Sequence, residues 1–160
     1  MGTLLAIYLY IIIHSGGQHE FISPVPESQA ADQVQVDLRA DNLRKFLSKY
    51  DSPLEEHAEY IVEISDRNGL DYRLIPSIAG TESTLCKHIP DASYNCWGWG
   101  IYGGQITRFD SYRQGIAIVG RGLGNPPYAG KSYQEFAEIY TARPDHWISA
   151  VSYFMEEIEG

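Results

Sequence analysis

LDYRLIPSIAGTEST, residues 70–84, predicts a buried helix that ends at an acidic side chain. Asp71 is suited to cap a helix that runs from residue 72 to about residue 84. Pro76 lies near this start, where it shortens or kinks only the first turn. The face at the spacing i, i+3, i+4 and i+7 carries Ile75, Ile78, Ala79 and Glu82. The pattern therefore puts a carboxyl group on the face that is expected to enter the core.

Glu82 has a chemical consequence at this position. A carboxyl group that leaves water loses solvation of its charged form, so its pKa rises. An acid that stays protonated near neutral pH is able to protonate a leaving group as a general acid. The alternative is a Glu at the edge of the apolar face that pairs with Arg or Lys or is simply solvated. Buried acids beside clefts are enriched in functional sites, which makes Glu82 the candidate catalytic residue.

The segment that follows, residues 86–104, has neither a helical nor a strand period. Its aromatic residues are Tyr94, Trp97, Trp99 and Tyr102, and its glycines are Gly98, Gly100, Gly103 and Gly104. Aromatic rings suit the apolar C–H face of a sugar, and glycine lets the backbone approach a ligand closely. Asn95 offers both a donor and an acceptor for an N-acetyl group. The cluster predicts a glycan-binding cleft, although any single Trp fits the core equally well.

Cys86 and Cys96 are the only cysteines of the chain. In an exported protein such a pair forms a disulfide, which here ties the end of the Glu82 helix to the aromatic segment. The rival interpretation takes Cys86, His88 and Cys96 as zinc ligands. No fourth ligand lies nearby and the spacing matches no common zinc site. We therefore predict a disulfide, no metal and no other cofactor.

Further helices are expected before residue 70 and after residue 104. Their predicted starts are near Asp41, at a capping box in residues 52–55, at Asp110 or Ser111, at a capping box in residues 132–135, and at Pro144. Their predicted ends are Asn68-Gly69 for the second, about Leu123 for the third and Tyr140 for the fourth. The sequence thus predicts a mainly α domain of five or six helices with one Gly/aromatic loop.

Residues 70–84 resemble the catalytic helix of the lysozyme-like superfamily, an apolar helix that ends in Glu-Ser. In the soluble lytic transglycosylases and related bacterial peptidoglycan hydrolases of this superfamily, that Glu is the acid. Residues 93–103, SYNCWGWGIYG, resemble the Tyr-Asn-aromatic-Gly segment of its endo-β-N-acetylglucosaminidases. Residues 109–123, residues 137–140 and Trp147 match further, so the similarity covers most of the folded part.

The resemblance implies a lysozyme-like helical domain over residues 37–160 that cleaves β-1,4-glycosidic bonds of a peptidoglycan-type glycan, with Glu82 as general acid. With the aromatic segment, it gives the candidate substrate-binding residues Ser83, Tyr94, Asn95, Trp97, Trp99, Tyr102 and Tyr140. Hydrolysis normally uses a second carboxylate, and Asp91 and Asp110 are nearby, although a turn and a helix cap explain them. The Gly-Leu-Met-Gln segment of true lytic transglycosylases is replaced by residues 98–101. Hydrolysis and anhydro-forming transglycosylation therefore both stay open.

Two other classes of function are compatible with the sequence. A catalytically inactive glycan-binding module would keep sugar affinity without turnover. A secreted interaction domain would use the aromatic loop to bind another protein.

The N-terminal residues predict export. Residues 1–17 contain the apolar run LLAIYLYIII, which is shorter than the ~20 residues of a membrane-spanning helix but suits a signal peptide cleaved after Gly17. An uncleaved membrane anchor over residues 1–19, or a buried strand, is the alternative. Residues 18–36 are expected to be a linker. The domain is then secreted, periplasmic, or anchored to a membrane and facing the cell wall.

Length and charge limit the partners of the domain. The chain has 160 residues, enough for one domain, and 12 Lys and Arg against 21 Asp and Glu give a net charge of −9. Such a balance excludes nucleic acid held through phosphate neutralisation. We expect a monomer whose partner is peptidoglycan or a related N-acetylated glycan.

Overall fold

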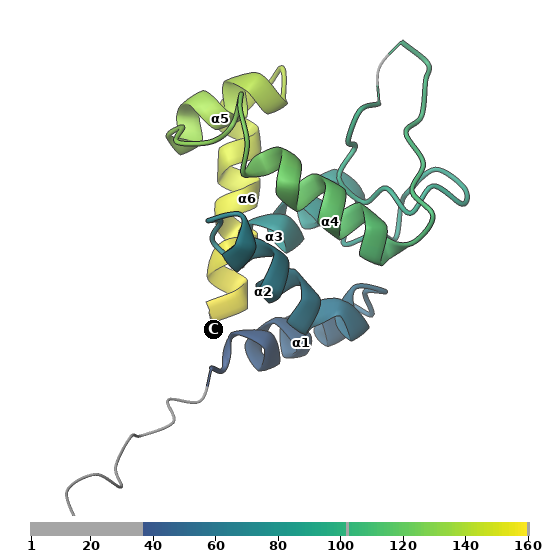
Figure 1. The fold of residues 1–160 in the computed structure, drawn as a ribbon, viewed down its shortest axis with the longest axis vertical. Helices are drawn as coiled ribbons and strands as arrows, with labels where there is room; N and C mark the ends of the chain where they lie inside the picture. The colour runs from purple at the N-terminus through teal and green to yellow at the C-terminus, as the bar shows by residue number, and fades with distance from the viewer. Residues whose placement is uncertain (1–36, 102, 160) are drawn as a thin grey trace, which may run out of the picture. The chain divides into compact units, whose positions relative to one another are not determined.

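The computed structural model describes residues 37–101 and 103–159, which form a helical domain (Figure 1). Its helices are α1 (Arg39–Lys49), the 3-10 turn η1 (Glu55–His57), α2 (Ala58–Arg67), α3 (Leu74–Ser83), α4 (Tyr112–Leu123), α5 (Tyr133–Tyr140) and α6 (Pro144–Glu159). These residues contain no strand, and the prediction of a mainly α domain is confirmed. The predicted signal or anchor, the linker and Tyr102 lie outside the described residues.

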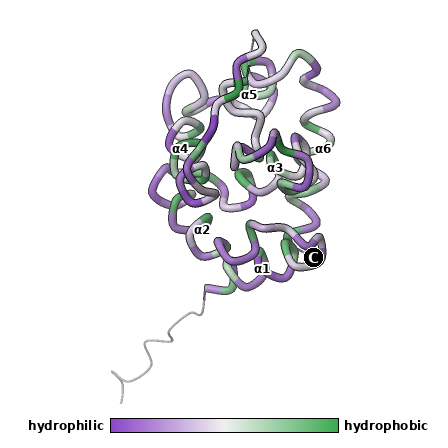
Figure 2. The backbone as a smooth tube through the Cα atoms, turned by 90° about the vertical axis from the view of Figure 1, so that its right-hand side faces the viewer, coloured by the Kyte–Doolittle hydropathy of each residue, from purple (hydrophilic) through white to green (hydrophobic). Residues whose placement is uncertain are grey.

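Helix α3 is the centre of the core. Every residue from position 74 to position 80 is buried, because this stretch carries no charge and is apolar or small on all sides. α6 packs along α3, and α2 and α4 also contact it (Figure 1). Gly80 permits the close approach of α6, since a Cβ atom there would lie 2.7 Å from the ring of Phe154. In Figure 2, hydrophobic and hydrophilic stretches alternate along the surrounding helices, as expected for helices with one face in the core.

Three predicted helix starts differ from the structure. α1 begins at Arg39 and not near Asp41, and Asp37 accepts a hydrogen bond from the Arg39 N–H (3.0 Å) at its start. α3 begins at Leu74 and not at residue 72, because the Asp71 carboxylate accepts a hydrogen bond from the Arg73 N–H (2.9 Å) and forms a turn there. The capping box at residues 52–55 does not form. Instead, the buried Ser52 hydroxyl donates to the carbonyl of Leu85 (3.0 Å) in the turn after α3. The same hydroxyl also accepts a hydrogen bond from the N–H of Leu54 (3.2 Å), and not from that of Glu55 as a capping box requires.

The starts of α4 and α5 follow local capping. The Ser111 hydroxyl accepts from the N–H of Gln114, so Ser111 is the N-cap of α4. Asp110, one of the two predicted caps, instead accepts from the Gln114 side-chain amide (2.6 Å). The capping box of Ser132 and Glu135 is present at α5 with both of its hydrogen bonds. The starts of α4 and α5 are therefore predicted correctly, apart from the assignment of the α4 cap to one of two neighbours.

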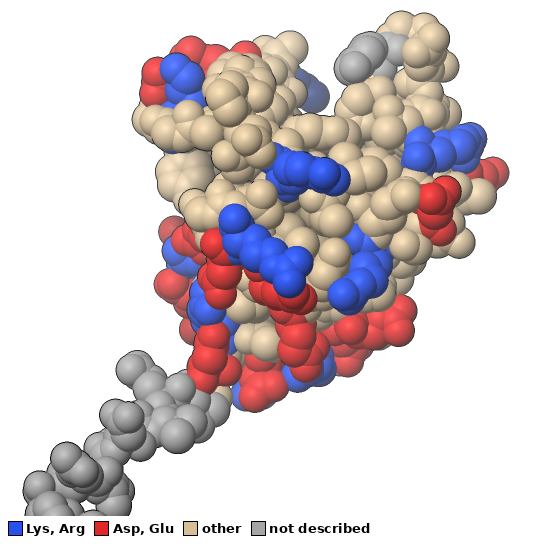
Figure 3. Space-filling view, in the orientation of Figure 1, with Lys and Arg blue, Asp and Glu red and all other residues tan. Residues whose placement is uncertain are grey.

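Charged side chains gather at one end of the domain. Figure 3, drawn in the orientation of Figure 1, shows most of these charged side chains over the lower part of the visible face, where α1 and α2 lie. The ion pairs there include Arg39 with Asp37 and Asp66, Arg44 with Asp41 and Glu59, and Lys49 with Glu157. The upper part is hollowed between two lobes whose facing surfaces are mostly uncharged. No helix in the part of the chain described above is long and apolar enough to cross a membrane.

Candidate functional site

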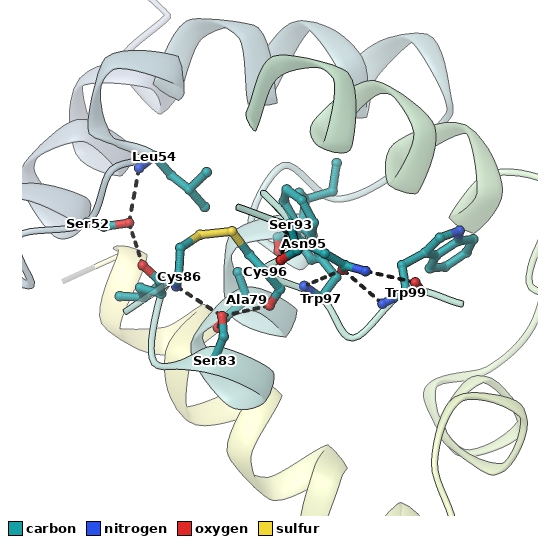
Figure 4. Close-up of a disulfide and its surroundings, with 12 residues drawn as sticks. Ser52, Leu54, Ala79, Ser83, Cys86, Ser93, Asn95, Cys96, Trp97 and Trp99 are labelled. Carbon is teal, nitrogen blue, oxygen red and sulfur yellow. Dashed lines mark hydrogen bonds between the residues drawn. A yellow bond between two sulfur atoms is a disulfide. The ribbon is translucent and has the colours of Figure 1, made fainter. Parts of the chain in front are cut away.

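A disulfide joins the turn after α3 to the aromatic segment. Cys86 and Cys96 are bonded, with their Cα atoms 4.7 Å apart (Figure 4). Thr84, Leu85 and Cys86 all have positive φ, so the chain reverses sharply as α3 ends. The predicted disulfide is confirmed, and the alternative of two thiolate ligands for zinc does not apply. Among the described residues, no group of His, Cys, Asp and Glu side chains is arranged to hold a metal ion.

Ser83 stabilises this turn and was expected to bind substrate. It is buried, and its hydroxyl lies 2.7 Å from the Cys96 carbonyl and 3.1 Å from the Ala79 carbonyl (Figure 4). The hydroxyl also accepts from the N–H of Cys86 (3.0 Å). Its hydrogen-bonding capacity is used inside the protein. The prediction of substrate contact is corrected to a structural role.

Asn95 organises the aromatic segment. Its amide group donates to the carbonyls of Trp99 (2.9 Å) and Thr107 (3.0 Å), and its side-chain oxygen accepts from the N–H groups of Trp97 (3.3 Å) and Trp99 (3.0 Å). Only 1% of Asn95 is exposed. With both donors and the acceptor engaged, it has no free group for an N-acetyl ligand. The prediction that Asn95 contacts a ligand is therefore corrected: its side chain holds the backbone of the loop in place through these hydrogen bonds.

The aromatic residues of this segment lie in different environments. Trp97 is fully buried, and its indole N–H donates to the carbonyl of Ile75 (3.0 Å), so it belongs to the core and not to a cleft. Tyr94 is 37% exposed and packs edge-on against Tyr112 at the start of α4, away from the cleft described next. Trp99 faces the cleft, and Tyr102 lies outside the described residues. Spacing along the chain did not distinguish them, because this irregular loop turns each ring in a different direction.

A cleft of about 370 Å³ opens between the aromatic segment and α5. It is lined by Gly98, Trp99, Gly100, Ile101, Pro127, Tyr128, Ile139 and Tyr140. This lining contains no charged side chain. Of the predicted substrate-binding residues, the structure brings Trp99 and Tyr140 together here, with ring centroids 6.4 Å apart. Tyr128 was missed; its ring lies 6.0 Å from Trp99, and its only signal in the sequence is its place directly after a Pro-Pro turn.

Glu82 lies next to this cleft. Its Oε2 is 3.4 Å from the position that a Cβ atom on Gly98 would occupy, and Gly98 lines the cleft. Its Oε1 accepts a hydrogen bond from the indole N–H of Trp147 on α6 (2.9 Å). The prediction that Glu82 is buried is wrong for the residue as a whole, which is exposed. In the last turn of α3, Ser83 stays buried, whereas Glu82 lies on the side of the turn next to Gly98 and the cleft.

The electrostatic setting of Glu82 nevertheless favours its protonated form. Protein atoms around the carboxyl group partly desolvate it and raise its pKa above 4.5, and this outweighs the opposite effect of the Trp147 hydrogen bond. No salt bridge among the described residues includes Glu82. The alternative of a Glu paired with Arg or Lys is therefore not what the structure has.

The two candidates for a second carboxylate lie elsewhere in the loop. Asp91 is exposed in its turn, where its backbone carbonyl accepts a hydrogen bond from Arg108. Asp110 is exposed and bonded to Gln114. Neither lines the cleft, and neither contributes to the pKa shift of Glu82. Within the described residues, the site therefore combines a single acid with an uncharged aromatic cleft.

Comparison of the chain with models of protein families, with curated proteins and with solved structures finds no match. A partly desolvated acid can deliver a proton, and the neighbouring rings can hold an uncharged ligand by stacking. This combination suits acid-catalysed cleavage of a bond in a ligand with apolar faces.

Proposed function

We propose that this domain cleaves β-1,4-glycosidic bonds of a peptidoglycan-type glycan, with Glu82 as general acid. The observation that carries the proposal is the placement of an acid with a raised pKa and no ion-pair partner directly beside an uncharged aromatic cleft. The helical architecture agrees with the proposed lysozyme-like fold. The Cys86–Cys96 disulfide supports export, because disulfides persist in oxidising compartments.

The cleft has the chemistry that a sugar requires. Trp99, Tyr128 and Tyr140 offer ring faces for the C–H side of pyranose rings. Gly98 and Gly100 leave the backbone open to the ligand, because no side chain covers it there. Without charged groups in the lining, binding depends on shape, stacking and hydrogen bonds.

The reaction follows from the position of Glu82. Its carboxyl proton moves to the glycosidic oxygen O4, and the bond between C1 and O4 breaks as the positive charge at C1 develops. In hydrolysis, a water molecule then adds to C1 and gives a reducing end. In transglycosylation, the C6 hydroxyl of the same sugar adds to C1 and closes a 1,6-anhydro ring. In both cases the Glu82 carboxylate is available to accept the proton that the attacking oxygen releases.

Cleavage is expected to slow as the pH rises through the pKa of Glu82, because a general acid acts only while it carries its proton. Since partial desolvation raises this pKa above 4.5, activity should extend to higher pH than a fully solvated Glu carboxyl group would allow. The measurement is kcat/KM on purified murein over about pH 4 to 8, with circular dichroism at each pH as a control for folding. A rate that climbs across this whole range would contradict the assignment.

Gly122→Ala is expected to weaken glycan binding up to about tenfold, since a displaced ring contact costs about 0.5–1.5 kcal/mol and each 1.4 kcal/mol is a factor of ten. Gly122 on α4 lies under the Trp99 indole, where a Cβ atom would come within 2.4 Å of the ring. The ring must therefore leave the position in which it lines the cleft. Calorimetric titration with N-acetylglucosamine oligosaccharides measures the change. Arg121→Ala, at the exposed neighbouring position, is the control, and equal affinities for the two variants would contradict this role of Trp99.

Mass analysis of the products of murein digestion tests the proposal. Reducing ends indicate hydrolysis, and 1,6-anhydro ends indicate transglycosylation; either supports glycan cleavage. Murein that is bound but left intact at mildly acidic pH would overturn it in favour of a glycan-binding module. Binding to another protein, unaffected by added saccharide, would overturn it in favour of an interaction domain.

A further inference from the structure

Trp147 carries a buried hydrogen-bond donor that has Glu82 as its partner. Only 3% of Trp147 is exposed, and its indole N–H donates to Oε1 of Glu82 (2.9 Å) from a position 65 residues further along the chain. A buried indole N–H needs an acceptor. In the part of the chain that the structure describes, the Glu82 carboxyl is the acceptor that it has.

The Trp147 ring is held firmly by its neighbours. It stacks on Phe136 (centroids 5.7 Å apart, planes at 21°) and lies 5.1 Å from the ring of Tyr140. Tyr140 is itself fixed, because its hydroxyl donates to the carbonyl of Trp97 (2.6 Å). The donor atom therefore has a defined position on α6, set by side chains other than Glu82.

We propose that Trp147 is a positioning residue that directs the proton of the Glu82 carboxyl onto Oε2, the oxygen next to the cleft. The indole N–H is a donor only and cannot accept a hydrogen bond. In a protonated carboxyl group the carbonyl oxygen is a stronger acceptor than the hydroxyl oxygen, so the N–H favours an Oε1 that does not carry the proton. The remaining oxygen, Oε2, lies 3.4 Å from the Cβ position of Gly98 in the cleft lining. The assignment of the proton rests on this geometry, and only its catalytic use rests on the proposed function.

Among the side chains near Glu82, Trp147 is the one whose hydrogen bond shifts the pKa of the Glu82 carboxyl group. Tyr140 on α5 is influenced by the Glu82 charge, but desolvation holds its pKa well above 10, so it stays neutral. Asp145 and His146, which flank Trp147 on α6, are exposed and do not contribute to the pKa shift of Glu82. The loop residues 97–100 carry no titratable side chain. Donation by Trp147 favours the carboxylate, so its loss should raise the pKa of Glu82 further.

The first test uses the unmodified protein. The indole N–H resonances of the tryptophans are followed by ¹⁵N–¹H NMR while the pH is lowered through the range in which Glu82 titrates. We expect the Trp147 resonance to move with the titration of Glu82, because protonation weakens its hydrogen bond. Trp97 donates to the Ile75 carbonyl, so its resonance should stay still and serves as an internal control. A Trp147 indole N–H chemical shift that does not change as Glu82 titrates would overturn the proposal.

The second test compares Trp147→Phe with Phe136→Leu. Both variants disturb the same aromatic stack, but only the first removes the N–H donor. The Glu82 carboxyl pKa, measured by ¹³C NMR, should rise more in Trp147→Phe, which lacks the donor, than in Phe136→Leu, which keeps it. On murein, Trp147→Phe should lower kcat about tenfold and shift the loss of activity to higher pH. Equal Glu82 pKa values in the two variants would overturn the proposal, whereas a wild type without activity would overturn the proposed function alone.

Discussion

Glu82→Gln is expected to leave the domain folded and to lower the rate of glycan cleavage by at least about 100-fold, the usual contribution of a general acid. Gln has the same shape as Glu and keeps an oxygen that can accept the N–H of Trp147. It has no carboxyl proton to give to the leaving oxygen. Binding of glycan in the cleft should persist, because Glu82 lies beside the lining and is not part of it. The expected signature is therefore a loss of kcat with little change in affinity.

Glu63→Gln provides the matched control for this variant. Glu63 lies on the exposed face of α2, where it pairs with Arg67, so the same chemical change occurs far from the core of α3. Murein cleavage is measured by release of soluble products, and thermal unfolding is recorded for all three proteins. We expect wild-type rates for Glu63→Gln. A Glu82→Gln protein with more than about a tenth of wild-type activity would place the acid at another residue.

The double substitution Cys86→Ala and Cys96→Ala has the largest expected effect on stability, a loss of about 2–3 kcal/mol in the free energy of unfolding. The disulfide closes a short loop, with a sequence separation of 10, and its removal restores freedom to the unfolded chain. Three consecutive residues with positive φ precede the loop, and such backbone persists only where the surroundings hold it in place. Denaturant titration of the variant and of the wild type measures the difference.

Loss of the disulfide should also affect activity. Asn95 and Trp97 flank Cys96 and set the course of the chain toward Trp99, so loosening this point disturbs one wall of the cleft. The wild type treated with a reductant is the parallel control, and it should match the double variant in both stability and activity. An unchanged free energy of unfolding would show that the remaining hydrogen bonds of Ser83 and Ser52 suffice to hold the turn.

The parts of the fold that local signals decide could be predicted from the sequence. The helical face of α3 and the capping box of α5 depend on residues three to four positions apart, and both are present. The capping box predicted at Ser52 fails for the opposite reason. Its hydroxyl accepts from the N–H of Leu54 and donates to the carbonyl of Leu85, 33 positions away, and spacing near Ser52 contains no information about this distant partner.

The site was predicted in outline but not in its detail. The residue types indicate which hydrogen-bonding groups Asn95 and Trp97 have. They do not indicate that these groups bond to the backbone of the loop and of α3 and are not free for a ligand. The distinction between an aromatic residue of the core and one of a cleft depends on the path of an irregular loop, which has no period to extrapolate. Trp147 stood out in the sequence only through the resemblance. Its contact with Glu82 depends on how α6 packs along α3.

The hydrogen bond from the Tyr140 hydroxyl to the Trp97 carbonyl has a thermodynamic consequence for ligand binding. It fastens α5 to the aromatic segment, and these two elements form the opposite walls of the cleft. Each side chain that a ligand must immobilise takes about 0.5–1.5 kcal/mol from the binding free energy. Walls fastened to each other before the ligand arrives largely avoid this entropic loss. An uncharged cleft can then hold a sugar chain with few contacts, because the cleft walls have little conformational freedom left to lose when the ligand binds.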